Sequence, residues 1–362
     1  MVAGCSSGDD DSGGGSGGGL GTGDGIADQL ELLPLPTELD EEAFFSVAYG
    51  DLAEASSLAG IEVTGDPEDP DDTEDLLQQL MAITTGAVDS DDPSPVLAVT
   101  PEAAHVERLI DLPAFVDEVG WNIFEVRRFV ENQNPPNSVT VMEGDFDEDR
   151  LDEALGEADD GVWVAGDPDG DLDIADSSPA RPIGEPLWLS LVDDRLVVAR
   201  TAEDMEAVRS SDGPMVADDE VMTGLAEALD DADVYSAMLF RGDMGFPGAA
   251  SPAEAEQRCE DGLTEPFLGV GAGIADDDGP VVVLTYFHAE PSGAEATAEG
   301  LKRLLDEGAS AANGEPWSES VEVDDISVAG NVTVARLRPV EPIRAAMWRQ
   351  LVLQRDNLVT YC

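Results

Sequence analysis

Hydrophobic and polar positions alternate in several short stretches of the chain, and this period of two predicts β-strands. The strands are expected at 44–50, 96–99, 139–142, 162–165, 172–174, 187–192, 195–199, 234–240, 267–272, 281–287, 321–328 and 332–337. Elsewhere apolar residues recur every three or four positions, which predicts amphipathic helices. The helices are expected at 53–58, 73–83, 115–130, 147–155, 201–208, 218–229, 292–305 and 343–353.

Local turn and cap signals give these elements their boundaries. Asp193-Asp194 and Gly330-Asn331 each separate two strand-like runs, as the turn of a hairpin does. Asp147 precedes a helical pattern as an N-cap, and both Thr201–Asp204 and Ser292–Glu295 match a capping box. The segment 162–165 is expected to pair with 172–174 across an acidic turn.

The order strand, strand, helix, hairpin, helix occurs twice, although the two halves share no repeated sequence. This order predicts an α+β protein of two modules, each a mostly antiparallel sheet with helices packed on one face. We expect a flexible segment over residues 1–28, a first module over 29–232 and a second over 233–362.

Charge changes the picture of the surface. The chain has 80 Asp and Glu residues against 17 Lys and Arg, which gives a formal net charge of −63. Such a chain would be repelled by a phosphate backbone, so nucleic acid is excluded as a partner. Because the acids are spread along the chain rather than clustered, we interpret them as a solvated surface suited to high salt, where screening removes their mutual repulsion. The alternative is a surface that captures cations or a cationic partner.

The first residues indicate where in the cell the protein is located. Residues 2–5 read Val-Ala-Gly-Cys, and a Gly/Ser/Asp-rich stretch that cannot form a core follows at once. These residues resemble the lipobox and tether of bacterial and haloarchaeal lipoproteins, which implies a lipid on Cys5 and an extracytoplasmic location at the cell surface. Since four residues precede Cys5, the apolar part of the signal peptide is expected upstream of Met1. The alternative is a chance cysteine in a flexible cytosolic tail.

Two further segments carry a family resemblance. A strand runs into Gly-Asp-Phe-Asp before a helix at Val139–Asp147, and an Arg-Leu-Val-Val-Ala-Arg strand precedes a capped helix at Arg195–Arg200. This layout is similar to that of uncharacterised extracytoplasmic lipoproteins of high-GC bacteria, over about residues 40–240. The shared motifs are structural, so the resemblance implies no catalytic residue.

The other two cysteines fit an oxidising compartment. Cys259 and Cys362 lack a CxxC partner or a neighbouring histidine, so metal binding and thiol catalysis are disfavoured. Outside the cell two such thiols commonly pair, and we expect a disulfide between them.

Signals for a cofactor are weak. Asp167, Asp169, Asp171 and Asp176 surround Gly170 in a spacing that partly matches a Ca²⁺-binding loop, although its first position is Ala165. The competing interpretation is an acidic hairpin turn that binds nothing. The chain has two histidines, His105 and His288, and lacks the HExxH and P-loop motifs.

The sequence therefore leaves two classes of function open. The leading hypothesis is a surface-tethered, non-enzymatic binding or envelope-associated module, with the membrane as a partner through the lipid on Cys5 and without a cofactor. The alternative is an extracytoplasmic hydrolase that uses acidic residues, with a divalent metal as an aid. Two carboxylates in an apolar-walled cleft would favour the enzyme.

Overall fold

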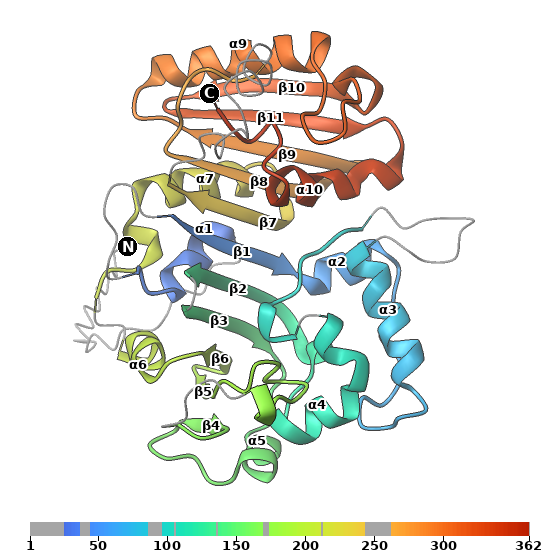
Figure 1. The fold of residues 1–362 in the computed structure, drawn as a ribbon, viewed down its shortest axis with the longest axis vertical. Helices are drawn as coiled ribbons and strands as arrows, with labels where there is room; N and C mark the ends of the chain where they lie inside the picture. The colour runs from blue at the N-terminus through green and yellow to red at the C-terminus, as the bar shows by residue number, and fades with distance from the viewer. Residues whose placement is uncertain are drawn as a thin grey trace, which may run out of the picture.

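The computed structural model describes residues 25–36, 44–85, 96–104, 106–134, 137–168, 174–210, 213–242 and 262–361. Its strands form one antiparallel sheet in the order β10-β11-β9-β8-β7-β1-β2-β3-β6-β5-β4 (Figure 1). The strands are β1 Phe45–Asp51, β2 Val126–Asn134, β3 Asn137–Gly144, β4 Trp163–Ala165, β5 Leu187–Val192, β6 Arg195–Ala199, β7 Val234–Arg241, β8 Gly269–Asp276, β9 Pro280–Phe287, β10 Val321–Ala329 and β11 Val332–Pro339. The expected α+β class and antiparallel pairing are confirmed.

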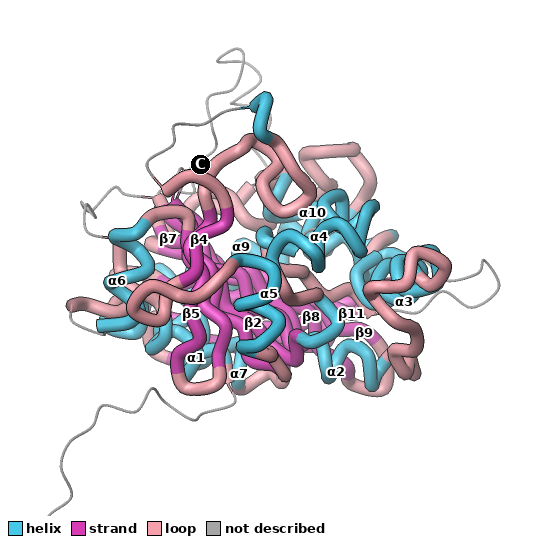
Figure 2. The backbone as a smooth tube through the Cα atoms, turned by 90° about the horizontal axis from the view of Figure 1, so that it is seen from below, coloured by secondary structure: helices cyan, strands magenta, loops and turns pink. Residues whose placement is uncertain are grey.

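Helices lie on both faces of this sheet. They are α1 Ile26–Gln29, α2 Leu52–Leu58, α3 Thr73–Thr85, α4 Leu112–Val119, α5 Glu148–Leu155, α6 Ala202–Ser210, α7 Glu220–Asp230, α9 Pro291–Glu307 and α10 Met347–Leu353. The apolar residues of α1, α6 and α7 belong to one core cluster, and those of α2, α3, α4, α5, α9 and α10 belong to another. Figure 2 looks along the sheet and shows α1 and α7 on one side of the strands and α4 and α10 on the other. The expectation of helices on one face is corrected, because alternate residues of the inner strands are apolar on both sides and both sides need cover.

The two halves of the chain repeat one strand topology. Each half begins with three consecutive antiparallel strands, β1-β2-β3 and β7-β8-β9, followed by a helix, α5 or α9. Each then forms a hairpin whose second strand returns to the third, so β6 pairs with β3 and β11 pairs with β9. The halves meet where β1 pairs with β7, so the sheet runs without a break past the expected module boundary at 232/233.

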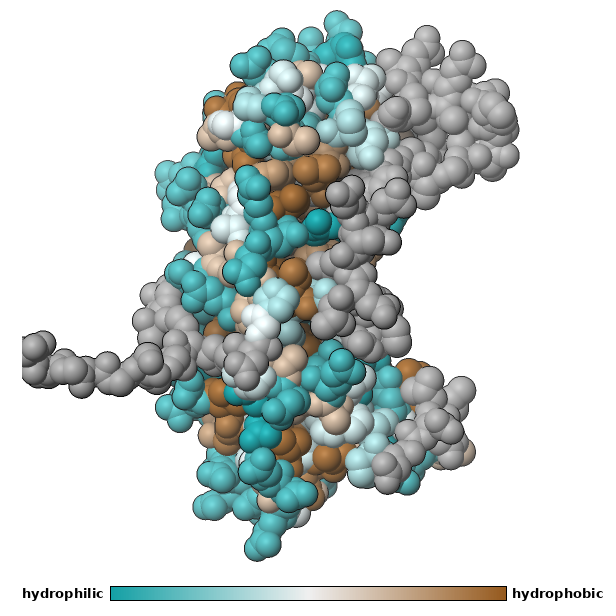
Figure 3. Space-filling view, turned by 90° about the vertical axis from the view of Figure 1, so that its left-hand side faces the viewer, coloured by the Kyte–Doolittle hydropathy of each residue, from teal (hydrophilic) through white to brown (hydrophobic). Residues whose placement is uncertain are grey.

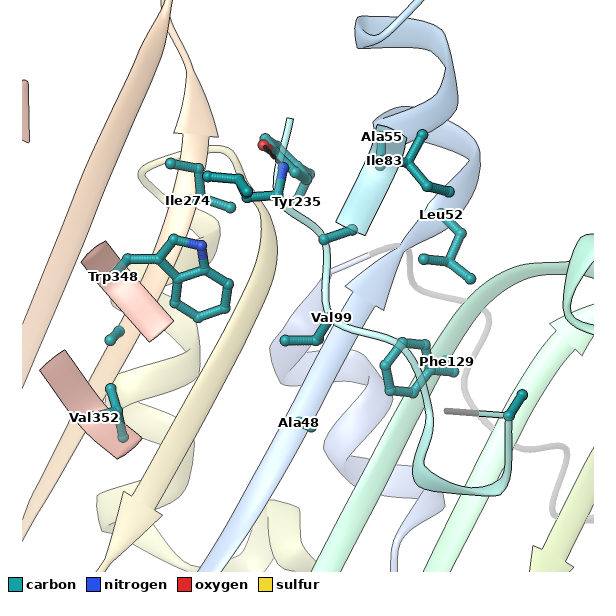
Figure 4. Close-up of a cluster of buried hydrophobic side chains, with 14 of the residues drawn as sticks. Ala48, Leu52, Ala55, Ile83, Val99, Phe129, Tyr235, Ile274, Trp348 and Val352 are labelled. Atoms are coloured by element: carbon teal, nitrogen blue, oxygen red, sulfur yellow. Dashed lines mark hydrogen bonds between the residues drawn. The ribbon is translucent and has the colours of Figure 1, made fainter. Parts of the chain in front are cut away.

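The core on the second face also spans both halves. Figure 4 shows Trp348 of α10 and Ile274 of β8 from one half near Val99, with Ala48 and Phe129 of the other half beyond it. The segment that carries Val99 was expected to be a strand, and this expectation is wrong. The amide of Leu97 donates to Tyr235 Oη (3.3 Å) and that of Val99 to Ser236 Oγ (2.9 Å), so side chains of β7, not a neighbouring strand, satisfy this backbone.

Three further local expectations need correction. The helical pattern over 115–130 ends with α4, and β2 begins at Val126, because Gly120 closes the helix with a positive φ of 74°. The strand β4 pairs with β5, while Ile174 begins a short 3-10 helix. The helix α9 starts at Pro291 with Glu290 as its N-cap residue, so Ser292 lies inside its first turn and caps nothing.

Candidate functional site

Most of the residues singled out from the sequence lie outside the described part of the chain. These are Cys5, Cys259, Cys362, Asp169, Asp171 and His105. Residues close in sequence to Cys259 and Cys362 are described. Among them, Leu263 forms a parallel bridge with Tyr361. Leu263 and Tyr361 therefore lie side by side, and the disulfide between Cys259 and Cys362 stays a prediction.

Two aspartates of the expected Ca²⁺ loop, Asp167 and Asp176, are described. Asp176 Oδ2 lies 3.3 Å from Arg181 Nη1, so an arginine neutralises one of the proposed ligands. Over the described ranges, no three His, Cys, Asp or Glu side chains are grouped as a metal site would require. The Ca²⁺ site stays a prediction, and the described residues supply no argument for it.

A carboxylate cluster lies where the strands β2, β3 and β6 run together. Glu131 of β2 is fully buried and accepts hydrogen bonds from the amide of Glu102 (2.8 Å), from Thr140 Oγ1 (2.8 Å) and from Gln133 Nε2. Burial raises the pKa of Glu131, because the charged form loses its water, and these hydrogen bonds oppose the rise. The raised pKa is what general acid catalysis would need.

The cluster is closed by an arginine. Arg200 makes ion pairs with Glu102 and Glu185, and its Nε donates to Ser138 Oγ (2.9 Å). Since Glu131 has no exposed surface and all three of its donors come from the protein, a substrate has no path to its carboxyl group. We interpret the cluster as structural: it links the sheet to the 3-10 helix Glu102–Ala104 and to the loop at 185.

His288 has a structural setting as well. Its side chain is buried, its Nδ1 lies 3.0 Å from the carbonyl oxygen of Pro266, and its ring contacts Phe267 edge-on. Burial lowers the pKa of His288, which favours the neutral imidazole. The ring therefore fixes the chain that enters β8 and has no access to a substrate.

The few cations of the chain pair mostly with its acids. A ladder of alternating charge crosses four strands through Asp51, Arg128, Glu143 and Arg195, with Arg128 Nη2 2.8 Å from Asp51 and Arg195 Nε 3.0 Å from Glu143. Other pairs include Arg127 with Asp145, Arg150 with Glu125, and Arg241 with Asp219. Figure 3 shows one side of the molecule, on which hydrophilic residues are widespread and hydrophobic residues lie in separate patches. The arginines thus mainly form ion pairs within the protein, while most acids face solvent.

A groove lies between the helix α7 and the β10–β11 hairpin. Its volume is about 770 Å³. The floor is apolar, with Phe287 of β9 and with Val332 and Val334 of β11. Ser327 and Ala329 of the edge strand β10 are exposed beside it. This is the candidate binding site of the molecule, because it is open to solvent and combines an apolar floor with polar walls.

One face of α7 forms the other wall of this groove. The face consists of residues three or four positions apart, which a helix brings into one row. They are Glu220, Thr223, Gly224, Glu227, Ala228 and Asp231. The opposite face of α7 is apolar and buried against β7, β8 and β9. Asp219 caps the helix by accepting from the amide of Met222 (3.0 Å) and also binds Arg241.

Neither the buried Glu131 nor the groove was predicted from the sequence. The sequence did contain a signal for Glu131. It lies two residues after Phe129, so in a strand both side chains point to the same buried face. The strand was not predicted because its first residues fit a helical pattern. For the groove, the small residues Gly224 and Ala228 on the polar side of the predicted helix were the available signal.

No family model, no curated protein and no solved structure matches the chain. Over the described residues, none of the helices combines the length and apolar character needed to span a bilayer.

Proposed function

We propose that the protein is a lipid-anchored, extracytoplasmic binding module that captures its ligand in the groove between α7 and the β10–β11 hairpin. The observation that carries the proposal is the apolar floor of this groove, where Val332 and Val334 are partly exposed beside the buried Phe287. By contrast, Glu131 and His288 are both buried, with the carboxyl group of Glu131 bonded to protein donors and Nδ1 of His288 next to the carbonyl oxygen of Pro266. Binding needs an accessible, shaped surface, and the groove supplies one.

The position of the chain entry supports the anchor part of the proposal. The helix α1 packs on α7, where the amides of Ile26 and Ala27 donate to the carboxylate of Asp230 at 2.6 and 2.9 Å. Asp231, at the same end of α7, lines the groove. Only the short segment between Cys5 and Gly25 separates the proposed lipid from α1 in the sequence, so a lipid on Cys5 would keep the groove close to the membrane surface.

The anchor is tested by fractionation of cells that make the full-length precursor. We expect wild-type protein in the detergent phase and Cys5→Ser in the aqueous phase, because the variant cannot be lipidated. Ser6→Ala changes the next residue but keeps the cysteine, so it serves as the matched control and should partition like wild type. Equal partitioning of wild type and Cys5→Ser would refute the anchor.

The binding role is tested with a photo-cross-linking amino acid at two adjacent positions of β10. Ser327 faces the groove, while Val328 pairs with the buried Thr333 and points to the other face. A discrete adduct in cells at Ser327 that is absent at Val328 is expected. If neither position gives an adduct, or both give the same one, the groove is not the binding site.

Hydrolysis is the second candidate function, and the raised pKa of Glu131 beside the carboxyl group of Glu102 is the observation in its favour. Complete burial of Glu131 argues against it, because no substrate atom could reach the carboxyl group. Screening of ester, glycoside and peptide substrates with wild type and Glu131→Gln distinguishes the two functions. Turnover that the substitution abolishes in a folded variant would establish the enzyme.

A further inference from the structure

The groove occupies a place that a helix fills in the other half of the molecule. On this face of the sheet, α6 lies over β3, β5 and β6 of the first half. Its Met205 and Val208 are buried against Val197 and Ala199 of β6, which are both 1% exposed. The topological counterparts of β3, β5 and β6 in the second half are β9, β10 and β11.

In the second half α7 covers β9 and reaches β11 on this face, and no described helix packs beyond it over β10. After β11 the chain passes to the opposite face, where α10 buries Trp348 and Leu351 in the other core cluster. Val332 and Val334 of β11 consequently stay half-buried, although they occupy the same face as Val197 and Ala199 do in β6. The sheet therefore presents a partly uncovered apolar strip of the kind that an amphipathic helix covers elsewhere in this same molecule.

Small residues lie on the α7 wall of the groove. Gly224 and Ala228 face the groove from α7, and a Cβ atom on Gly224 would lie 2.6 Å from Cε2 of Phe287. The lack of a side chain at Gly224 thus lets the ring of Phe287 pack directly on the helix. The α7 wall spans eleven residues, or about 16 Å of helix. This length matches a partner helix of about three turns.

The negative charge along the groove favours a positively charged ligand. Asp218, Glu220, Glu227 and Asp231 are all exposed along the α7 side. The cation among the lining residues, Arg336, is engaged with Asp277 (3.5 Å) and with the carbonyl oxygen of Ala232 (3.3 Å). An anionic ligand would meet this acidic wall unfavourably, whereas Lys or Arg side chains would pair with it.

We infer that the groove binds a basic amphipathic helix of a partner protein, which lies along α7 with its apolar stripe on Phe287, Val332 and Val334. This inference rests on the proposed binding function and names the class of its ligand. The partner helix lies beside α7 and completes the layer over β11 and β10, as α6 completes it over β6 and β5. Its Lys and Arg residues face Glu220, Glu227 and Asp231.

The test uses a fluorescent peptide of about 15 residues made of leucine and lysine, with leucine at helical i, i+3 and i+4 spacing. Fluorescence anisotropy with the full chain measures the dissociation constant, and a peptide of the same composition with scattered leucines is the reference. We expect the amphipathic peptide to bind at least about tenfold more tightly than the reference peptide. Equal binding of the two would mean non-specific attraction to an acidic protein and would overturn the inference.

Two pairs of variants locate the site. Ser327→Trp fills the groove and should weaken binding about tenfold, while Val328→Trp, on the other face, should not. Glu220→Gln with Glu227→Gln should also weaken binding, whereas Glu153→Gln with Glu157→Gln, which removes two exposed acids elsewhere, should not. Circular dichroism confirms that each variant is folded. Equal effects within either pair would refute the location.

Two outcomes separate this inference from the proposed function. If the peptide does not bind but the cross-linker at Ser327 still gives its specific adduct, the groove binds a ligand of another class and the helix inference fails alone. If wild-type protein self-associates in sedimentation and Ser327→Trp abolishes this, a second copy is the occupant and the inference is again wrong. Absence of the adduct together with absence of peptide binding rejects both proposals.

Discussion

Glu131 couples the stability of the fold to pH. Because burial raises its pKa in the folded protein above the ordinary value of 4.5, folding favours the protonated form. The contribution of this group to stability is therefore fully present below the unfolded pKa and is lost as pH rises through the folded pKa. At neutral pH the folded protein either keeps Glu131 protonated or buries its negative charge, and both lower the free energy of unfolding.

Glu131→Gln should remove this pH dependence. The glutamine oxygen can take the place of Oε2 and accept from Glu102 and Thr140, while the amide of Gln133 turns to present its oxygen to the new NH₂ group. Urea unfolding at fixed salt should show the difference in unfolding free energy, variant minus wild type, rising as the pH increases above the ordinary carboxyl pKa of 4.5.

Glu131→Ala is the comparison for that measurement. It leaves the buried donors around the site without an acceptor, and it should be less stable than Glu131→Gln by about 1–3 kcal/mol at every pH, because neither variant titrates at this position. A difference between wild type and Glu131→Gln that is constant with pH would contradict the raised pKa.

Hairpin turns give a test at the scale of one element. Asp193 and Asp194 join β5 to β6 with φ of 50° and 63°, the left-handed conformation that glycine and asparagine adopt more easily than aspartate with its charge. Asp193→Asn with Asp194→Gly should therefore stabilise the protein by about 0.5–1 kcal/mol, measured as a shift of the thermal midpoint. Loss of charge alone is controlled by Asp193→Asn with Asp194→Asn, which should give a smaller gain. If the glycine variant is no more stable than this control, backbone strain does not limit the turn.

Salt dependence belongs to the whole molecule. Its net charge of −63 is repulsive, and the Debye length falls from about 10 Å at 0.1 M to about 3 Å at 1 M salt. We expect the thermal midpoint to rise continuously with NaCl in this range. At about pH 4, where many carboxyl groups are protonated, the same salt should raise the midpoint much less. An equal rise at both pH values would identify a general salting-out effect and not charge repulsion.

The predicted disulfide between Cys259 and Cys362 also affects the stability of the whole molecule. Leu263 and Tyr361 pair as neighbours, and Cys259 and Cys362 stand four residues and one residue away from them along the chain. We expect mass spectrometry of non-reduced, secreted protein to find the peptide pair joined by a disulfide. Loss of the bridge in Cys259→Ser should lower stability by about 2–5 kcal/mol. Two free thiols in wild-type protein would be the contrary result.

Local structure could be predicted from the sequence because it depends on neighbours along the chain. The hairpin β5–β6, the cap at Asp147 and the helix α7 follow from a period and a few turn residues. Composition sets the net charge directly. Even the repeated order of elements in the two halves could be recognised, since order along the chain needs no knowledge of space.

Pairings between distant segments were decided only by the tertiary structure. The β1–β7 contact, which fuses the halves, joins residues about 190 positions apart, and no local period encodes such a partner. The same holds for the face that each helix covers, because an apolar stripe states that a helix must pack but not on which side. Burial of Glu131 and opening of the groove beside α7 follow from those choices. On one face α6 covers β3, β5 and β6, whereas α10 packs on the opposite face, so among the described helices none covers β10 beside α7.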